Sequence, residues 1–120
     1  MSRHNPAVTL WQIHDHALVG MEFSHGRKRA DLDGDPLLRL AAERLVIILG
    51  EAVYRLPDEL LAKYPKTAWH SIRGTRNVIV HGYDIVDRDR LWDILTLHLP
   101  ELRKEIENIL QSEGWPKPTA

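Results

Sequence analysis

Residues 35–56 read DPLLRLAAERLVIILGEAVYRL and point to a helical protein. Asp35 followed by Pro36 is a typical N-cap and first-turn proline, so a helix is expected from that proline to the end of the stretch. Its apolar residues recur every three or four positions, as on one helical face: Leu38, Ala41, Leu45, Ile48, Leu49, Ala52 and Leu56. Val46 and Ile47 lie outside this stripe, which predicts either a central place in a bundle or a subunit interface.

Other segments with helical periodicity flank this one. Helices are expected over residues 6–25 and from about 67 to 81, with a short one over 57–63. A further helix should run over 87–109, where Pro100 would kink or divide it. The β-branched residues near the end of the 67–81 segment leave a strand possible there. The expected fold is all-α, an up-and-down bundle of four main helices plus a short one.

Composition narrows the class of protein. The chain has 120 residues, which fits one domain, expected over 1–113 with a flexible tail at 114–120. Its formal net charge of −1 gives no overall basic footprint for nucleic acid, and the absence of cysteine excludes disulfides and thiolate chemistry. No apolar run reaches the roughly 20 residues that span a bilayer, and the N-terminus lacks a signal-peptide core. A cytoplasmic location is the default expectation.

The candidate site lies in residues 71–83, which read SIRGTRNVIVHGY. Arg76 can bind phosphate through its planar fork of donors, and His81 can transfer protons near neutral pH. Phosphate binding and proton transfer are the two functions that a protein must supply for metal-free cleavage of RNA by its own 2′-hydroxyl group. Residues five apart are about 140° apart on a helix, so His81 should lie where the helix ends, before Gly82. A single arginine and histidine are few groups for a nuclease site. A two-fold dimer would double the number of cationic and acid/base groups in one cleft.

The order of residues from Arg76 to His81 resembles the motif of HEPN-domain ribonucleases. The wider matches at 72–77, 82–83 and 99–102, with LGEA at 49–52, are similar to HepT-like toxins of the HEPN/MNT toxin–antitoxin type. The resemblance implies a homodimeric RNase that needs no metal or other cofactor, with the arginine and histidine of both subunits in a shared cleft.

Carried onto this sequence, the resemblance makes Arg76 and His81 catalytic and Asn77 a supporting polar residue. It also implies a cognate nucleotidyltransferase antitoxin of the MNT type, which silences the toxin by adding AMP to the tyrosine two residues after the histidine, here Tyr83. A bulky anion next to Arg76 would compete for its charge. Arg73, one helical turn before Arg76, either adds to the same anion site or is a surface residue.

Structural roles for the same residues remain open. Arg76 can pair with Glu51 or Asp84, His81 can cap a helix, and Tyr83 can pack its ring. The whole chain can also be a non-catalytic module that pairs with a nucleotidyltransferase or binds RNA or a nucleotide. Gly74, between the two arginines, is a candidate for a close approach between helices.

Two other clusters carry less weight. Positions two apart on a helix point about 200° from each other, so His14 and His16 are not expected to share a metal with Asp15. The basic run at 26–29, GRKR, is expected to be a solvated loop, with guidance of RNA as the alternative.

Overall fold

A computed structural model describes residues 5–80 and 87–118, and all regular structure within them is helical, which confirms the all-α prediction. There are four long helices: α1 (Pro6–Ser24), α3 (Pro36–Tyr54), α5 (Trp69–Val80) and α7 (Leu99–Glu113). The short elements are α2 (Asp31–Gly34), α4 (Asp58–Lys63), α6 (Arg88–Asp93) and the π-helical turn η1 (Ile94–His98). Over these ranges, no helix combines the length and the apolar character needed to cross a membrane.

Side-chain caps fix where three helices begin. Asn5 accepts a hydrogen bond from the amide of Ala7 at 2.9 Å, at the start of α1. Asp35 accepts from two amides of the first turn of α3, as its place before Pro36 predicted. Asp87 caps α6 in the same way, through the amide of Arg90 at 3.1 Å. These short polar side chains therefore mark the first residues of α1, α3 and α6.

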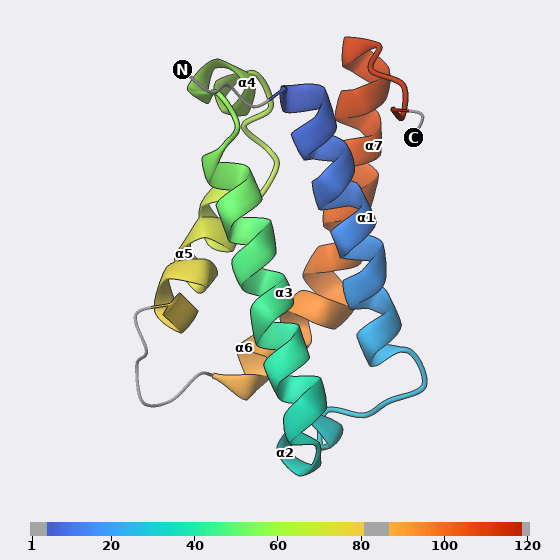
Figure 1. Cartoon of the computed structure of the whole chain (residues 1–120), viewed down its shortest axis with the longest axis vertical. Helices are drawn as coiled ribbons and strands as arrows, with labels where there is room; N and C mark the ends of the chain where they lie inside the picture. The colour runs from blue at the N-terminus through green and yellow to red at the C-terminus, as the bar shows by residue number, and fades with distance from the viewer. Residues whose placement is uncertain (1–4, 81–86, 119–120) are drawn as a thin grey trace.

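Helix α3 is the centre of the fold, as its broad apolar surface predicted. It packs against α5 on one side and α1 on the other, and α7 packs against α1 (Figure 1). The buried face differs slightly from the predicted stripe, because Ala41 is exposed while Ala42 and Val53 are buried. Ala42 follows Leu38 by four residues and Val53 follows Leu49 by four, so the helical spacing is kept and the face is rotated.

The predicted last helix is divided. α6 leads into the wider π-helical turn η1, and α7 begins at Leu99, with Pro100 in its first turn. Proline has no amide to donate to the preceding turn, which accounts for a break in the regular α-helical ladder at this point. The prediction that Pro100 would kink or divide the helix is confirmed.

The connection between α1 and α3 contains a short helix, α2, that the sequence did not predict. Buried Leu32 anchors α2 in the core, and ion pairs link this connection to α6: the Arg88 Nη1 lies 2.8 Å from Asp33, and the Arg29 Nε lies 2.6 Å from Asp89. Arg27 donates to the carbonyl oxygen of Phe23. Both arginines of the basic run therefore make contacts within the protein.

The contact between α1 and α7 includes a polar cluster around a buried histidine. One ring nitrogen of His14 lies 2.8 Å from a Glu107 carboxylate oxygen, and the other lies 3.2 Å from Asp15. The hydrogen bond with His14 is the largest influence that lowers the pKa of Glu107 below its usual value. Beyond α7, the Trp115 carbonyl oxygen accepts from the Trp11 indole at 3.1 Å, and Lys117 lies 3.3 Å from Asp15.

Candidate active site

Helix α5 carries the predicted phosphate-binding residues on the flank that meets α3. Arg73, Arg76 and Asn77 span about 100° of the helix surface, so their side chains leave α5 in related directions. The structure therefore brings the three together. His81 and Tyr83 lie outside the residues that the structure describes.

Gly50 of α3 allows α5 to come close at the position of Arg76. A Cβ atom at residue 50 would overlap the Cβ and Cγ of Arg76 and would lie 3.4 Å from the Ile72 carbonyl oxygen. The backbones of α3 and α5 can be this close only because residue 50 has no side chain. A Cβ at Gly74, by contrast, would meet no other helix within 4 Å among residues 5–80 and 87–118. The close approach therefore depends on Gly50, and the suggestion that it depends on Gly74 was wrong.

Arg76 is held by two polar contacts. Its Nη1 donates to the Asn77 Oδ1 at 3.0 Å, and its Nη2 lies 3.7 Å from a Glu51 carboxylate oxygen. The Asn77 Nδ2 in turn donates to the Tyr54 hydroxyl at 3.0 Å. Asn77 thus links the guanidinium on α5 to a tyrosine on α3, and it orients Arg76 rather than neutralising it.

Arg73 and Arg76 both lie against the ring of Tyr54. Their guanidinium carbons are 4.7 Å and 5.6 Å from the ring centroid, within the range of cation–π attraction. The Arg73 Nη2 also lies 3.4 Å from the Val53 carbonyl oxygen. The Nε of each arginine is buried and has no hydrogen-bond partner among the described residues. An anion that approached this flank would therefore meet the terminal guanidinium nitrogens of the two arginines.

Sequence reasoning missed Tyr54. The signal was present, because Tyr54 follows Gly50 by four residues and Glu51 by three, so the three residues lie side by side on α3, next to its apolar face. The periodicity could not show that α5 packs there.

Comparison with known proteins agrees with the family resemblance of the sequence. A family model described as "Ribonuclease HepT-like" matches residues 13–109, which cover most of the chain. The chain belongs to the HepT-like ribonuclease family. No solved structure shows a significant match.

Three relatives of this HepT-like chain illustrate the range of similarity. "Putative RNase TTE0752" of Caldanaerobacter subterraneus subsp. tengcongensis is 36% identical over 103 residues, covering 82% of this chain and 92% of the relative. "Putative RNase MJ0127" of Methanocaldococcus jannaschii is 32% identical over 111 residues, 92% of each chain. "Probable ribonuclease HepT" of Thermococcus cleftensis is 27% identical over 75 residues, 62% of this chain and 68% of the relative.

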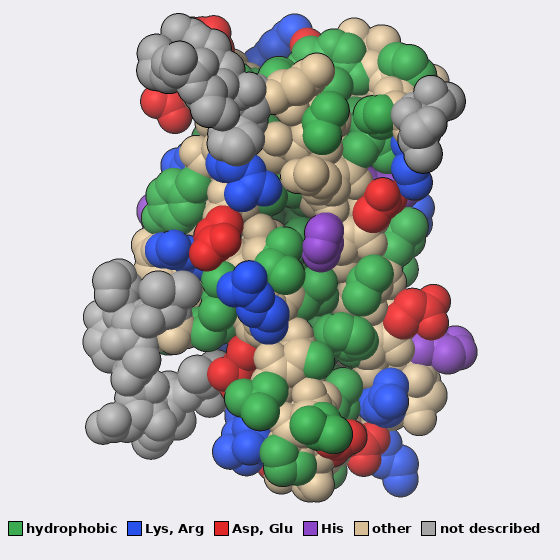
Figure 2. Space-filling model, viewed as in Figure 1, with side chains coloured by type: hydrophobic (Ala, Val, Ile, Leu, Met, Phe, Trp, Pro, Cys, Tyr) green, Lys and Arg blue, Asp and Glu red, His purple; other side chains and the backbone are tan. Residues whose placement is uncertain are grey.

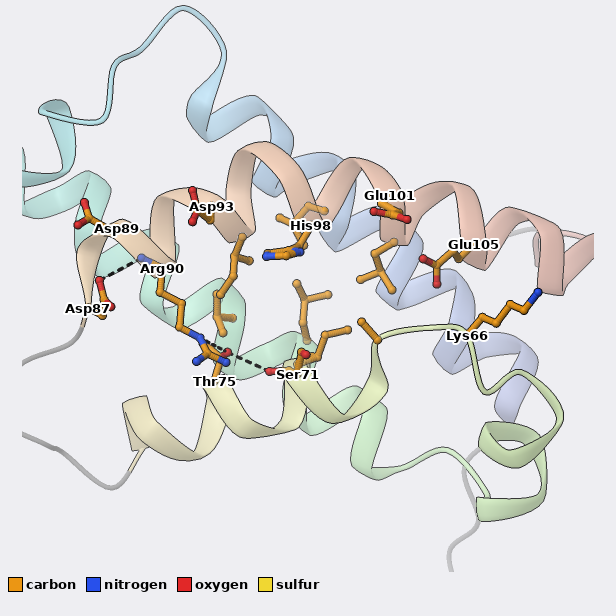
Figure 3. Close-up of a pocket in the computed structure, with 17 residues that line it drawn as sticks. Lys66, Ser71, Thr75, Asp87, Asp89, Arg90, Asp93, His98, Glu101 and Glu105 are labelled. Carbon is orange, nitrogen blue, oxygen red and sulfur yellow. Dashed lines mark hydrogen bonds between the residues drawn. The ribbon is translucent and has the colours of Figure 1, made fainter.

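A pocket of about 470 Å³ lies on the other flank of α5 in this HepT-like protein, between α5 and the run from α6 to α7 (Figure 3). Ser71 and Thr75 line it from α5, and Thr75 accepts a hydrogen bond from the Arg90 Nε at 3.1 Å. Five carboxylates line it from the opposite side: Asp87, Asp89, Asp93, Glu101 and Glu105.

The charge of this pocket argues against phosphate binding there. Lys66 and Arg90 are its two basic lining residues, fewer than its carboxylates. An excess of negative charge in a concave site repels a phosphate. The flank of α5 that carries Arg73 and Arg76, where Glu51 is the acidic partner, has the more favourable charge for an anion.

Proposed function

We propose that this protein is a metal-independent endoribonuclease, the toxin of a HEPN/MNT toxin–antitoxin pair. The observation that carries the proposal is the pair of arginines on α5, held against Tyr54 and next to Asn77, in a chain of the HepT-like family. Two guanidinium groups on one helix flank match a phosphate in charge and in hydrogen-bond geometry.

The proposed reaction uses the nucleophile of RNA itself. The 2′-hydroxyl attacks the adjacent phosphorus, the bond from phosphorus to the 5′-oxygen breaks, and the products end in a 2′,3′-cyclic phosphate and a 5′-hydroxyl. Arg76 stabilises the charge that develops on the non-bridging oxygens, with Arg73 adding to the same field. His81 transfers a proton to or from the reacting oxygens. No step requires a metal ion.

His81→Ala tests the proton-transfer role. Purified wild-type protein is expected to cleave single-stranded RNA in excess EDTA, and His81→Ala to be slower by about 100-fold or more, since general acid–base catalysis contributes 10²–10⁴-fold. The rates are measured by gel electrophoresis of an end-labelled RNA. An unchanged rate for His81→Ala would remove this residue from the mechanism.

The proposal includes a homodimer with one shared cleft, as the family resemblance implies. Self-association, rather than the cleft, is supported by a set of exposed apolar side chains on neighbouring helices: Leu37 and Leu40 on α3, and Leu18 and Val19 on α1. Figure 2 shows hydrophobic side chains gathered over the lower part of α3 and the adjoining stretch of α1. Large apolar patches on a surface commonly mark a protein interface.

Light scattering coupled to gel filtration tests the dimer. Twice the mass of the 13.9 kDa chain is expected for the wild type, and Leu40→Glu is expected to shift it toward the monomer. A monomeric wild type at micromolar concentration would contradict this part of the proposal.

The proposal also includes silencing by an MNT-type nucleotidyltransferase that adds AMP to Tyr83. Its support is the position of Tyr83 two residues after the histidine of the motif, in a HepT-like chain. Incubation with the cognate enzyme and ATP is expected to add one or more AMP masses, measured by intact mass spectrometry, and Tyr83→Phe to remain unmodified. The same mass increase on Tyr83→Phe would place the modification elsewhere.

The second candidate is a binding module that pairs with the nucleotidyltransferase or binds RNA without cleaving it. The proximity of Glu51 to Arg76 and the net charge of −1 favour it, because both weaken the field available to a scissile phosphate. Expression of the chain alone distinguishes the two. Growth arrest relieved by Arg76→Ala supports the nuclease, and unimpaired growth supports the module.

A further inference from the structure

We propose that Tyr54 is a stacking platform for a base of unpaired RNA, next to the phosphate bound by Arg76. This inference rests on the proposed function and deepens it, because it names a side chain that would bind an unpaired base of the substrate. It also assigns a binding role to a residue of α3, outside the motif on α5.

The geometry makes Tyr54 an aromatic surface with a fixed orientation. It is the last residue of α3, and 47% of it is exposed although its ring contacts two arginines. The Asn77 amide holds its hydroxyl at 3.0 Å. Large exposed aromatic residues usually lack such restraints, and orienting the ring in advance lowers the entropy cost of binding.

The neighbours of the ring determine which ligand it suits. A nucleotide presents a flat base and an anionic phosphate, and Tyr54 lies next to two cations that suit the phosphate. Bases stack on exposed aromatic rings only when they are free of a duplex. Stacking on an aromatic side chain tolerates any base, so binding should favour unpaired RNA with little preference for sequence.

The competing role is purely structural, in which Tyr54 serves only to hold Asn77 and thereby Arg76. The two roles depend on different parts of the side chain. Holding Asn77 requires the hydroxyl group, whereas stacking requires the ring. Tyr54→Phe and Tyr54→Trp keep an aromatic ring and lose the phenol, while Tyr54→Leu loses both.

The test uses a short single-stranded RNA with 2′-O-methyl riboses, which lacks the attacking hydroxyl and is not cut by the proposed reaction. Fluorescence anisotropy at one fixed salt concentration gives the Kd for each variant. Tyr54→Leu is expected to weaken binding by about tenfold, in line with the loss of one stacked base. Tyr54→Phe and Tyr54→Trp are expected to lose only the smaller contribution that the hydroxyl makes by fixing the ring, and to bind clearly more tightly than Tyr54→Leu.

Two controls test whether the effect is specific to Tyr54 and to the bases of the RNA. Leu97→Ala truncates another exposed apolar side chain, on η1, and is expected to leave binding unchanged. An oligomer of the same backbone without bases is expected to bind the wild type and Tyr54→Leu equally, because only the stacking contribution is then absent. Circular dichroism verifies that each variant is folded.

Each outcome decides between the two roles. Equal weakening by Tyr54→Phe and Tyr54→Leu overturns the platform and supports the structural role, and so does a Tyr54→Leu variant that binds like the wild type. In both cases cleavage of ordinary RNA by the wild type leaves the proposed nuclease intact. If the wild type neither binds nor cleaves RNA, the proposed function fails and the platform with it.

Discussion

Arg76→Ala is expected to slow RNA cleavage by about 100- to 1,000-fold, the usual effect of removing one group that stabilises charge in a transition state. The guanidinium is oriented by Asn77 at 3.0 Å, so it needs little rearrangement to meet a phosphate. The cleavage rate of Arg76→Lys is expected to fall between those of the wild type and Arg76→Ala, because lysine keeps the charge but not the planar fork of donors. The measurement is the single-turnover rate at saturating protein.

The matched control for this substitution is Arg103→Ala. Arg103 lies on α7, where it pairs with Glu107 at 3.0 Å, so its removal also takes an arginine away from a carboxylate, while Glu107 keeps its contact with His14. Cleavage by Arg103→Ala is expected to equal that of the wild type. A loss of activity in Arg76→Ala that is matched by Arg103→Ala would point to stability rather than phosphate binding, and thermal melts of both variants separate these causes.

Gly50→Ala is expected to reduce both stability and activity. The added methyl group would overlap the Cβ of Arg76, so α3 and α5 must separate. Overpacking of this kind costs about 1–3 kcal/mol of the free energy of unfolding. The shift also displaces the guanidinium, and a misplacement of about 1 Å can cost up to 100-fold in rate. Denaturant melts and cleavage rates measure the two effects.

Gly74→Ala is the control, because it makes the same chemical change on α5 where the added methyl group would contact no other helix in the described part of the chain. It is expected to stabilise the protein by about 0.5–1 kcal/mol, the usual gain from replacing glycine inside a helix, without slowing cleavage. Equal effects of Gly50→Ala and Gly74→Ala would show that the close approach of the helices at Arg76 has no consequence.

Local signals in the sequence were enough for most of the fold. Asp35 could be recognised as a cap, residue 87 as the start of the last helix and Pro100 as a break, because such signals depend on neighbouring residues alone. The short helix α2 could not be predicted in this way. The packing of the connection that contains it depends on distant residues, as in the ion pair between Arg29 and Asp89, which are 60 residues apart along the chain.

In the candidate site, too, local features could be predicted from the sequence, whereas contacts between distant residues could not. Phosphate binding by Arg73 and Arg76 was predicted from their type and spacing on one helix, and the supporting role of Asn77 from the family resemblance. Their partner, Tyr54, belongs to another helix. Sequence periodicity shows which residues share a helical face but not which faces pack against each other. For the same reason Gly74 was suspected as the site of close approach, although the contact depends on Gly50, on the facing helix.

The chemistry of the RNA ends tests the proposed mechanism most directly. RNA is incubated with the wild-type protein in excess EDTA, and the fragments are analysed by mass spectrometry. Internal attack by the 2′-hydroxyl predicts fragments that end in a 2′,3′-cyclic phosphate, or the monophosphate formed when it opens, paired with fragments that begin with a 5′-hydroxyl. Fragments that begin with a 5′-phosphate, or cleavage that EDTA abolishes, would contradict the mechanism.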